Sequence, residues 1–388
     1  MPVINSIADY HNEMVRWRQD IHAHPELAFE ETRTADVVAN LLQEFGIEIH
    51  RGLATTGVVG TLRNGNGPVI GLRADMDALP LDEKNTFEHR SCHSGKMHAC
   101  GHDGHTTMLL GAARYLAQSK NFSGTVNFIF QPAEESIGGA RVMVEEGLFD
   151  KFPCASVYGM HNMPEMAVGS FAIRSGPMLA ACDTFELRVQ GHGGHAAMPH
   201  QGVDTIVVAA QIVTALQTIP SRNIAPVDSA VVSVTQIHGG DADNIIPDDV
   251  VLRGTCRSFS AEVRDGFESQ IRRIAEGIAA AHGARIELDF ERGYPATINH
   301  VRESEIAGKI AAEIAGSEHV NLNPKPVMGG EDFSYMLEAK PGSYIFIGNG
   351  MGSGGCMLHN PHYDFNDEIL ATGASYWARL VEHELPAE

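Results

Sequence analysis

Hydrophobic residues recur every three or four positions in the first 45 residues, which is the spacing of one buried helix face. A helix is therefore predicted over residues 6–21, where Ser6 and Asp9 form a capping-box-like start. A second helix is predicted over residues 35–45, and Gly46 is well placed as its C-terminal stop.

Strand-like and helix-like runs then alternate along the chain as far as residue 174. This alternation favours an α/β layer architecture with a largely buried sheet. The predicted strands are 58–62, 69–74, 125–130, 155–160 and 170–174, and the predicted helices are 106–118 and 140–149.

The middle of the chain has a different pattern of apolar and polar residues. Residues 184–190 alternate apolar and polar side chains, as a half-exposed strand does. The order that follows is β-α-β-β-α-β, the split unit of a ferredoxin-like domain. After that strand come helix 204–219, strands 230–237 and 250–257, helix 261–282 and strand 285–290.

The α/β rhythm then resumes with helix 306–315, strand 344–348 and helix 369–384. The simplest organisation is an α/β domain formed by residues 1–180 and 294–388. It is interrupted by an inserted ferredoxin-like (βαββαβ) α+β domain formed by residues 181–293.

The composition is that of a globular protein: of 388 residues, 43% are hydrophobic and 20% are charged. Lys and Arg number 28 against 49 Asp and Glu, a net charge of −21, which argues against nucleic acid or a membrane as partner. No apolar run approaches the ~20 residues that cross a bilayer. The first residues do not read as a signal peptide, and the six cysteines are too scattered for a disulfide scaffold. We therefore expect reduced thiols in the cytoplasm.

The strongest chemical signal lies at residues 97–105, where Cys100 and His102 precede a predicted helix in a glycine-containing segment. Both side chains can converge on one ion, and a thiolate with an imidazole suits zinc and its transition-metal neighbours. A polar turn that caps the helix, with a structural thiol, is the alternative interpretation of this motif alone.

Glu134 and Glu135 directly follow an apolar strand, where α/β folds place their active sites. One carboxylate can bind a metal while its neighbour handles protons. Taken alone, the pair is more typical of a solvated acidic loop.

His161 follows a predicted strand, and His359 follows a glycine-rich loop at 348–355. A single histidine of this kind is more often a polar residue with ordinary partners than a metal ligand. Asp75 and Asp77 leave strand 69–74 on the same side, where outer partners of metal-binding imidazoles can lie. Together with the cysteine and glutamate motifs, these strand ends favour a metal site.

In the inserted domain, three histidines including His195 lie in the glycine-rich segment 191–200. They can be interpreted as a metal tract, but no Cys, Asp or Glu nearby completes a ligand shell, so contact with a substrate is favoured. Asn244 and Arg257 are candidate carboxylate binders, since a guanidinium holds a carboxylate in a bidentate manner. For Arg257 alone, an ordinary surface arginine is at least as good an interpretation.

Taken in order, these segments resemble the M20 metallopeptidase family, and specifically its aminoacylase branch of hippurate hydrolases and auxin-conjugate amidohydrolases. The resemblance runs over essentially the whole chain. The matching segments are HPEL at 24–27, RADMDALP at 73–80, HACGHDGH at 98–105, QPAEE at 131–135, GMH at 159–161, GGHAAMPH at 193–200, NIIP at 244–247, GGEDF at 329–333 and LHN at 358–360.

The resemblance implies two divalent metal ions, zinc or manganese, in the α/β catalytic domain. A cysteine stands here where the wider family often bridges its metals with an aspartate, and it is the implied bridge. The implied ligands are Cys100, His102, Glu135, His161 and His359.

The resemblance also assigns roles around the metals: Glu134 is the general base, and Asp77 orients a ligand imidazole. The inserted domain is implied to form a homodimer, with a higher homo-oligomer also possible. His195 is expected to reach the substrate oxyanion in its own or in the partner subunit's site. Asn244 and Arg257 are expected to hold the substrate carboxylate.

The implied activity is hydrolysis of hippurate-like N-acyl amino acids to a carboxylic acid and a free amino acid. A dipeptidase or carboxypeptidase on the same dinuclear site is the alternative among enzymes. A catalytically silent metal-dependent binding protein is the alternative from another class. A thiol redox protein using Cys100 is disfavoured, because the chain has no Cys-x-x-Cys motif.

Overall fold

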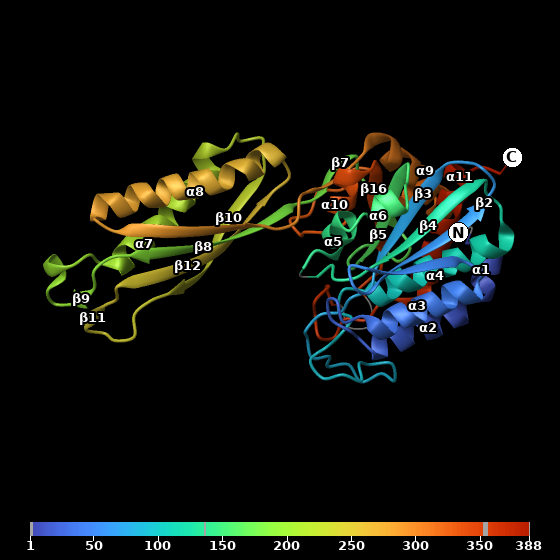
Figure 1. Cartoon of the computed structure of the whole chain (residues 1–388), viewed down its shortest axis with the longest axis horizontal. Coiled ribbons are helices and arrows are strands. Elements are labelled where there is room, and N and C mark those ends of the chain that lie inside the picture. Colours follow the sequence, from blue (N-terminus) through green and yellow to red (C-terminus); the bar gives the residue numbers. More distant parts are fainter. Residues whose placement is uncertain (1–2, 136, 352–355, 388) are drawn as a thin grey trace. The chain divides into compact units, whose positions relative to one another are not determined.

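The computed structural model describes residues 3–135, 137–351 and 356–387. The chain forms two compact units, and Figure 1 labels most of their helices and strands. Unit 1 comprises Met1–Met178, Ile298–Lys325 and Asp332–Glu388, and unit 2 comprises Leu179–Thr297 and Pro326–Glu331. The segment Pro326–Glu331 lies outside the range predicted for the inserted domain.

Unit 1 is built on an eight-stranded mixed sheet. β3 pairs in parallel with both β4 and β5, and β5 pairs in parallel with β16, so the carboxyl ends of these strands share one edge. In sheet order the strands are β1 (Glu48–Leu53), β2 (Gly57–Asn64), β4 (Gly124–Gln131), β3 (Val69–Asp75), β5 (Ser156–Met163), β16 (Gly342–Gly348), β6 (Phe171–Ala172) and β15 (Val320–Asn321).

Helix α4 is the central helix of unit 1 and packs against α2, α3 and α11. Its first three turns are buried throughout, and the small residues there allow this close packing. The helices of unit 1 are α1 (Asn5–Asp9), α2 (His11–Ala23), α3 (Thr32–Glu44), α4 (His102–Ser119), α5 (Gly139–Glu145), α6 (Leu148–Lys151), α9 (Val301–Ala315), α10 (Ser334–Ala339) and α11 (Leu370–Glu384), with 3-10 turns at Ser317–His319 and Asp367–Ile369.

Two predicted helices of unit 1 are each divided in the structure. The helix expected over 6–21 breaks at Tyr10, whose hydroxyl donates a hydrogen bond of 2.9 Å to the Gly111 carbonyl oxygen. The helix expected over 140–149 breaks at Gly147, which has a φ of 87°. The strand expected over 170–174 is reduced to Phe171–Ala172.

Unit 2 has the order β-α-β-β-α-β with a four-stranded sheet β10-β12-β8-β13, all pairs antiparallel. This confirms the predicted α/β fold with a ferredoxin-like insertion. The main elements are β8 (Ala181–Gln190), α7 (Thr205–Leu216), β10 (Ala230–His238), β12 (Asp249–Ser258), α8 (Ala261–His282) and β13 (Arg285–Arg292). The short elements are β9 (Gly194–His195), the 3-10 turn Pro199–Gln201, a π-helical turn at Ile219–Asn223 and β11 (Ile245–Ile246). In addition, β7 (Gly176–Leu179) pairs with β14 (Thr297–Asn299).

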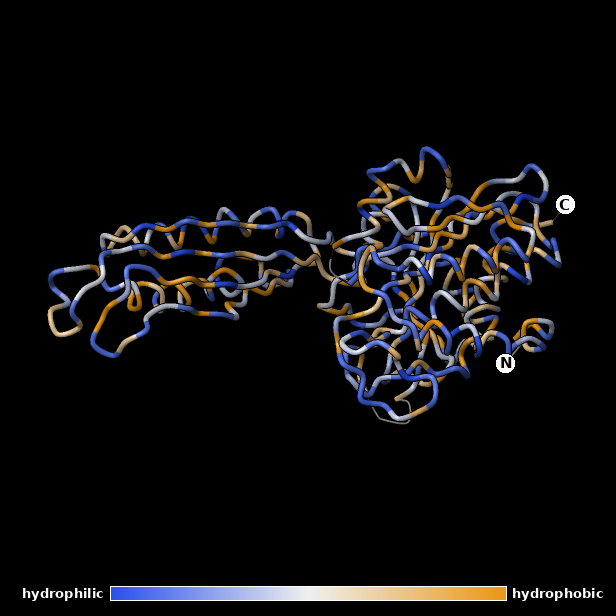
Figure 2. The backbone as a smooth tube through the Cα atoms, turned by 60° about the horizontal axis from the view of Figure 1, so that its bottom comes forward, coloured by the Kyte–Doolittle hydropathy of each residue, from blue (hydrophilic) through white to orange (hydrophobic). Residues whose placement is uncertain are grey.

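Side chains of β8 alternate between buried and more exposed positions, because one face of the sheet packs against α7 and α8. Figure 2 shows hydrophobic and hydrophilic positions interspersed along the chain of unit 2. Among the described residues, no helix combines the length and apolar character needed to span a membrane.

The two ends of the inserted unit lie side by side. Asp183 near the start of β8 faces Arg292 at the end of β13. Arg264 of α8 joins these ends, since its Nη2 lies 2.7 Å from Asp183 Oδ1 and donates to the Gly293 carbonyl oxygen at 2.7 Å. The insertion therefore begins and ends at one fixed place.

Candidate active site

Three neighbouring parallel strands bring acidic and imidazole side chains to one edge of the large sheet. β3 ends at Asp75 and is followed by Asp77, β4 ends shortly before Glu134 and Glu135, and β5 carries His161 near its end. Because these strands lie in the order β4-β3-β5, their carboxyl ends gather the side chains where α/β sheets bind ligands.

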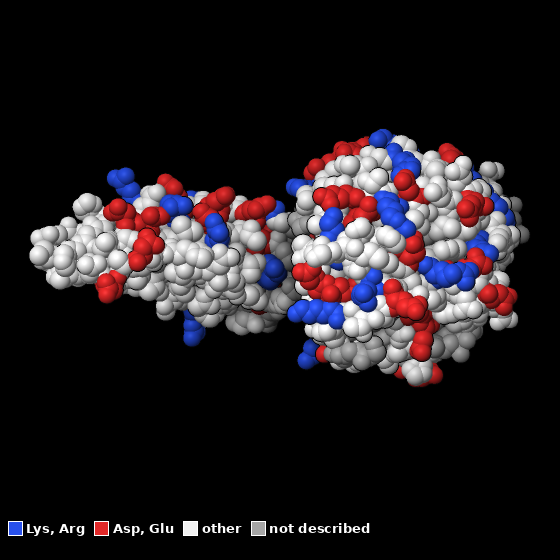
Figure 3. Space-filling model, turned by 90° about the horizontal axis from the view of Figure 1, so that it is seen from below, with Lys and Arg blue, Asp and Glu red and all other residues white. Residues whose placement is uncertain are grey.

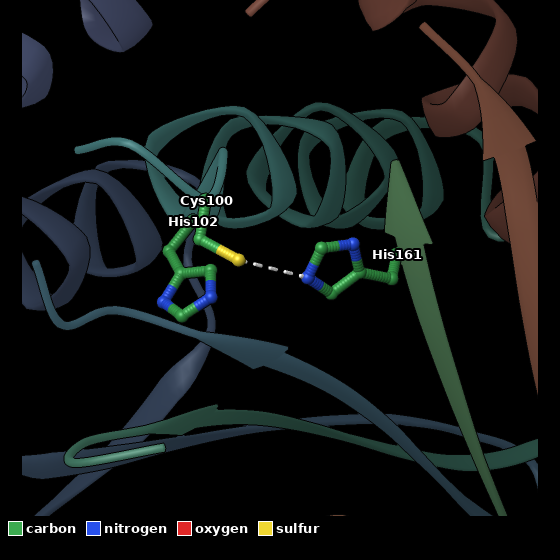
Figure 4. Close-up of side chains that lie close together, drawn as sticks. All are labelled: Cys100, His102 and His161. Atoms are coloured by element: carbon green, nitrogen blue, oxygen red, sulfur yellow. Dashed lines mark hydrogen bonds between the residues drawn. The ribbon is translucent and has the colours of Figure 1, made fainter. Parts of the chain in front are cut away.

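The start of helix α4 and the residues just before it add His102 and Cys100 to this edge, and Figure 4 shows the Cys100 sulfur pointing towards His161 of β5, with His102 beside it. The Cys100 Sγ lies 3.4 Å from His161 Nε2. Between Cys100 and His102, the first residue of α4, Gly101 has a φ of 94°, and a Cβ there would lie 2.4 Å from Asn162 Oδ1. Glycine is thus required for the turn that brings a thiol and an imidazole together.

The five residues implied as metal ligands converge in the structure. The ligand atoms of Cys100, His102 and His161 lie within 4.8 Å of one another, and so do those of Cys100, Glu135 and His359. Cys100 belongs to both groups, as a thiolate shared by two ions would.

Two buried atoms in this cluster lack a hydrogen-bond partner among the described residues: His102 Nε2 and Glu135 Oε1. They lie 3.7 Å apart. Buried polar atoms are nearly always paired, so these two are suited to binding a cation. A thiolate, imidazoles and a carboxylate form a donor set typical of zinc and its neighbours, and the residues present therefore fit a metal centre.

The electrostatics of the cluster also favour a cation. Burial, reinforced by Glu135 and Glu134, raises the pKa of the Cys100 thiol well above its usual range. Burial opposes a charge on His102, but the nearby carboxylates, with Asp75 first among them, raise the pKa of this imidazole to about 10. A divalent ion would displace both protons, because a metal ligand must be deprotonated.

Glu134 is buried beside the cluster, with its Oε2 4.0 Å from His102 Nε2. Asp77 contacts two of the candidate ligands. Its backbone oxygen lies 2.8 Å from His102 Nδ1, and its Oδ2 accepts a hydrogen bond of 2.9 Å from the backbone N–H of Glu135. Because Asp77 contacts Nδ1 of His102, the Nε2 atom of this ring is available to bind a metal. Groups that contact a metal-binding histidine commonly fix the ring in this way.

His359 reaches the cluster from the last part of the chain. Its Nε2 lies 3.4 Å from Glu135 Oε1, and its side chain is 55% exposed. Its φ of 63° is unusual for a residue other than glycine. Residues 352–355 of the glycine-rich loop that precedes it lie outside the described residues.

A buried pair that the sequence analysis left unassigned lies behind the cluster. His105 Nδ1 is 2.6 Å from Asp75 Oδ1, and its Nε2 contacts the backbone nitrogen of Asn162 at 3.0 Å. The spacing of His102 and His105, one turn apart on α4, is the signal that places both imidazoles on the same side of the helix.

The three predicted substrate contacts all belong to unit 2, and they do not converge there. His195 in β9 pairs with Ile245 in β11, so Asn244 lies next to it at the outer end of the sheet. Arg257 lies at the other end of β12 and donates a hydrogen bond of 2.9 Å to the Cys256 carbonyl oxygen. Asp249, at the outer end of β12, is eight residues away, or about 27 Å along the strand.

Comparisons with known proteins agree with this geometry. Residues 71–383 match the family described as peptidase family M20/M25/M40. The chain is 44% identical over 382 residues to the hippurate hydrolase of Campylobacter jejuni, covering 98% of this chain and 99% of that protein. It is 39% identical over 385 residues to thermostable carboxypeptidase 1 of Saccharolobus solfataricus, covering 97% and 96% respectively.

A solved structure is similar over almost the whole chain. It is the Bacillus subtilis YXEP protein, described as a dinuclear metal-binding peptidase from the M20 family. The TM-score is 0.85 and the identity is 35%, with 97% of this chain and 99% of that chain covered. From the family match, the full-length similarities and the cluster of candidate ligands, we conclude that this chain belongs to the peptidase family M20/M25/M40.

Proposed function

We propose that this protein is a metal-dependent amidohydrolase that cleaves N-acyl amino acids to a carboxylic acid and a free amino acid. The observation that carries the proposal is the 44% identity, over nearly the full length of both chains, to a hippurate hydrolase. The convergence of Cys100, His102, Glu135, His161 and His359 on one sheet edge supports it.

We propose that these five residues hold two divalent ions, zinc or manganese, with Cys100 shared between them. A bound metal pair supplies Lewis-acid polarisation of the amide carbonyl and lowers the pKa of a water molecule towards ~7. The mixed sulfur, nitrogen and oxygen donor set is compatible with both metals, although the thiolate favours zinc.

Glu134 is proposed as the general base because it lies beside the candidate ligand cluster. Its neighbour Glu135 is a member of that cluster, and the backbone N–H of Glu135 is held by Asp77. Its carboxylate would take a proton from water and pass it to the nitrogen of the leaving amine. Asp77 would keep His102 in the tautomer that offers Nε2 to a metal.

The proposed assembly is a homodimer formed through the inserted unit. Helix α7 has no charged residue and exposes Ile206 and Val207, and β10 is an edge strand of its sheet. His195 and Arg257 lie too far apart within one inserted unit to bind one small substrate. We therefore propose that His195 and Asn244 serve the partner subunit's site, where His195 donates to the developing oxyanion.

Arg257 is proposed to bind the substrate carboxylate. The proposed partner is a small molecule rather than nucleic acid, since basic and acidic side chains are interspersed on the face shown in Figure 3. A cytoplasmic location is proposed because Cys92, Cys100, Cys154, Cys182 and Cys256 are free thiols.

The decisive test of the general base is Glu134→Gln. We expect the variant to keep its metal content, because Glu134 is not in the proposed ligand set, and to lose about 10²–10⁴-fold in kcat. Metal content is measured by elemental analysis and kcat with hippurate. Full activity of the variant would show that the base is another group.

A peptidase acting on free dipeptides or peptide C-termini is the second candidate function, favoured by the 39% identity to a carboxypeptidase. The two functions differ in whether the acyl part of the substrate carries a free amine. Metal-loaded protein is assayed against matched N-acyl amino acids and dipeptides. We expect higher kcat/KM on the N-acyl series; equal or higher values on dipeptides would favour the peptidase, and no turnover on either series would favour a binding protein.

A further inference from the structure

A buried carboxylate outside the proposed ligand set contacts the loop that carries the general base. Glu31 is fully buried at the residue preceding helix α3. Its Oε2 accepts a hydrogen bond of 2.6 Å from the Thr56 hydroxyl, and its Oε1 accepts one of 2.9 Å from the backbone N–H of Ala133. Ala133 immediately precedes Glu134, so Glu31 is one residue away from the proposed base.

Glu31 is not needed to cap its own helix. At this position a short polar side chain such as Asp or Ser ordinarily accepts hydrogen bonds from the first backbone N–H groups of the helix, and Glu31 makes no such bond. Glu26 does so instead, accepting from the N–H of Arg33 at 3.0 Å and of Thr34 at 2.8 Å. The Glu31 carboxylate is therefore directed at the catalytic loop rather than at α3.

The backbone that Glu31 holds is unusual. Ala133 has a φ of 57°, a left-handed conformation that costs free energy for a residue with a side chain. The Ala133 carbonyl oxygen accepts a hydrogen bond of 2.9 Å from the N–H of Gly139, so both sides of this residue are fixed. Without the Glu31 contact, a buried N–H would lose its partner and the loop would relax towards an ordinary conformation.

The other end of the Glu134–Glu135 pair is held by Asp77, which accepts from the Glu135 N–H at 2.9 Å. The two acidic residues of the loop thus lie between two buried carboxylates, each binding a backbone N–H. Asp77 also contacts His102, whereas the carboxylate of Glu31 contacts Thr56 and the loop.

We propose that Glu31 is a positioning residue for Glu134: it fixes the left-handed turn at Ala133 and so aims the base at the metal cluster. This inference rests on the proposed role of Glu134 as general base. A misplacement of about 1 Å in a catalytic group can cost about 10²-fold in rate, so the effect belongs in kcat rather than in substrate or metal binding.

The test separates the length of the Glu31 side chain from its charge. Glu31→Asp keeps the carboxylate but shortens its reach by about 1.5 Å, which breaks the 2.9 Å contact with Ala133. Glu31→Gln keeps the length and an oxygen acceptor. We expect kcat to fall about 10–100-fold in Glu31→Asp, with KM and metal content unchanged, and to be restored to within about 3-fold of wild type in Glu31→Gln.

Glu26→Asp is the matched control, because Glu26 also holds a backbone N–H and a threonine hydroxyl near the start of α3. A role of Glu31 in folding alone predicts the same modest effect on kcat in Glu26→Asp and Glu31→Asp, and that result would overturn the proposal. An unchanged kcat in folded Glu31→Asp would also overturn it. If Glu31→Asp does not fold, Thr56→Val replaces it: a fall in kcat at constant KM supports the proposal, and wild-type kcat refutes it.

Amide hydrogen exchange over residues 131–140 provides a readout that needs no substrate. We expect faster exchange at Ala133 in Glu31→Asp than in wild type or Glu31→Gln. If wild type hydrolyses neither N-acyl amino acids nor dipeptides, the proposed function fails while the exchange result still shows whether Glu31 holds the loop. Unchanged exchange at Ala133 would refute the positioning role even in an active enzyme.

Discussion

At the scale of single residues, Asp77 joins two proposed ligands through different atoms of one side chain. Its Oδ1 lies 3.2 Å from His102 Nδ1, while its Oδ2 accepts from the Glu135 N–H. An asparagine offers only one oxygen, so one of these contacts is lost in Asp77→Asn. We expect metal affinity to fall about 10–100-fold, as measured by competition with a chelator. Asp9→Asn, at an exposed position, is the control and should bind metal as wild type does.

The buried imidazole of His22, which lies outside the candidate metal cluster, predicts that the free energy of unfolding depends on pH. His22 Nδ1 lies 2.8 Å from Asp103 Oδ2, and Nε2 lies 3.3 Å from Glu83 Oε1. Burial opposes the charged form, but these carboxylates outweigh it and raise the pKa of His22 to about 9. The folded protein therefore holds this proton more tightly than the unfolded chain, where the pKa is about 6.5.

The stabilisation from His22 is complete below pH about 6.5 and is lost as the pH rises through about 9. His22→Gln should thus lower the free energy of unfolding more at about pH 6 than at about pH 10. Urea unfolding of both proteins at the two pH values measures this. A difference that grows with pH would contradict the charge state inferred for His22.

Residues next to strand ends were identifiable from the sequence only as a set, because each Glu pair or single His there has an ordinary explanation when it is taken alone. Glu31 was not, because its contact with Ala133 joins positions 102 residues apart and depends on how α3 packs near the end of β4. Asp75 was predicted as an outer partner of an imidazole, but the sequence did not show that His105 is the imidazole it contacts.

At the scale of elements, the start of α4 packs tightly against the C-terminal part of unit 1. A Cβ at Gly104 would lie 2.2–2.4 Å from three ring atoms of Phe365, which is itself buried. A buried aromatic ring has little room to move, so Gly104→Ala should destabilise unit 1 by about 1–3 kcal/mol.

Gly277→Ala is the control for this change, because it lies in α8 of unit 2 and its Cβ meets no atom within 4 Å. Both tryptophans, Trp17 and Trp377, lie in unit 1, so their fluorescence during urea unfolding reports that unit. We expect a lower midpoint for Gly104→Ala and an unchanged one for Gly277→Ala. An unchanged midpoint in both variants would mean that the Phe365 ring moves aside freely.

Elements with a strong hydrophobic period were predictable and those without one were not. β8 alternates along its length and was predicted within a few residues. β1 was not predicted, because it is an edge strand whose side chains are mostly exposed and follow no apolar pattern. The break at Gly147 was not predicted for a similar reason: the residues on either side keep helical spacing, and only the glycine ends the helix.

At the scale of the whole molecule, the proposed dimer makes the state of assembly and the activity inseparable. A charge on the apolar face of α7 should prevent association, so we expect Val207→Asp to be a monomer by light scattering. It should also lose most of its activity, because His195 would no longer reach a partner's site. Ala280→Asp, on the exposed side of the charged helix α8, is the control and should remain an active dimer.

A Val207→Asp protein that stays dimeric would place the interface elsewhere. A monomer with full activity would show that each chain completes its own site. The order of elements predicted both units of the chain, because βαββαβ has few compact solutions. No sequence pattern, in contrast, shows which surface of the inserted unit meets a partner.

Asp183 and Arg292 face each other across neighbouring strands, and Arg264 ties the two points where the inserted unit begins and ends. The residues between Asp183 and Arg292 therefore form one continuous excursion of the chain that starts and ends at the same place. A short peptide bridge across that spot should remove the excursion and leave the eight-stranded sheet and the candidate ligand cluster intact, while Pro326–Glu331 would lose the unit to which it belongs. The sheet that carries the candidate ligands can thus be studied separately from the inserted unit.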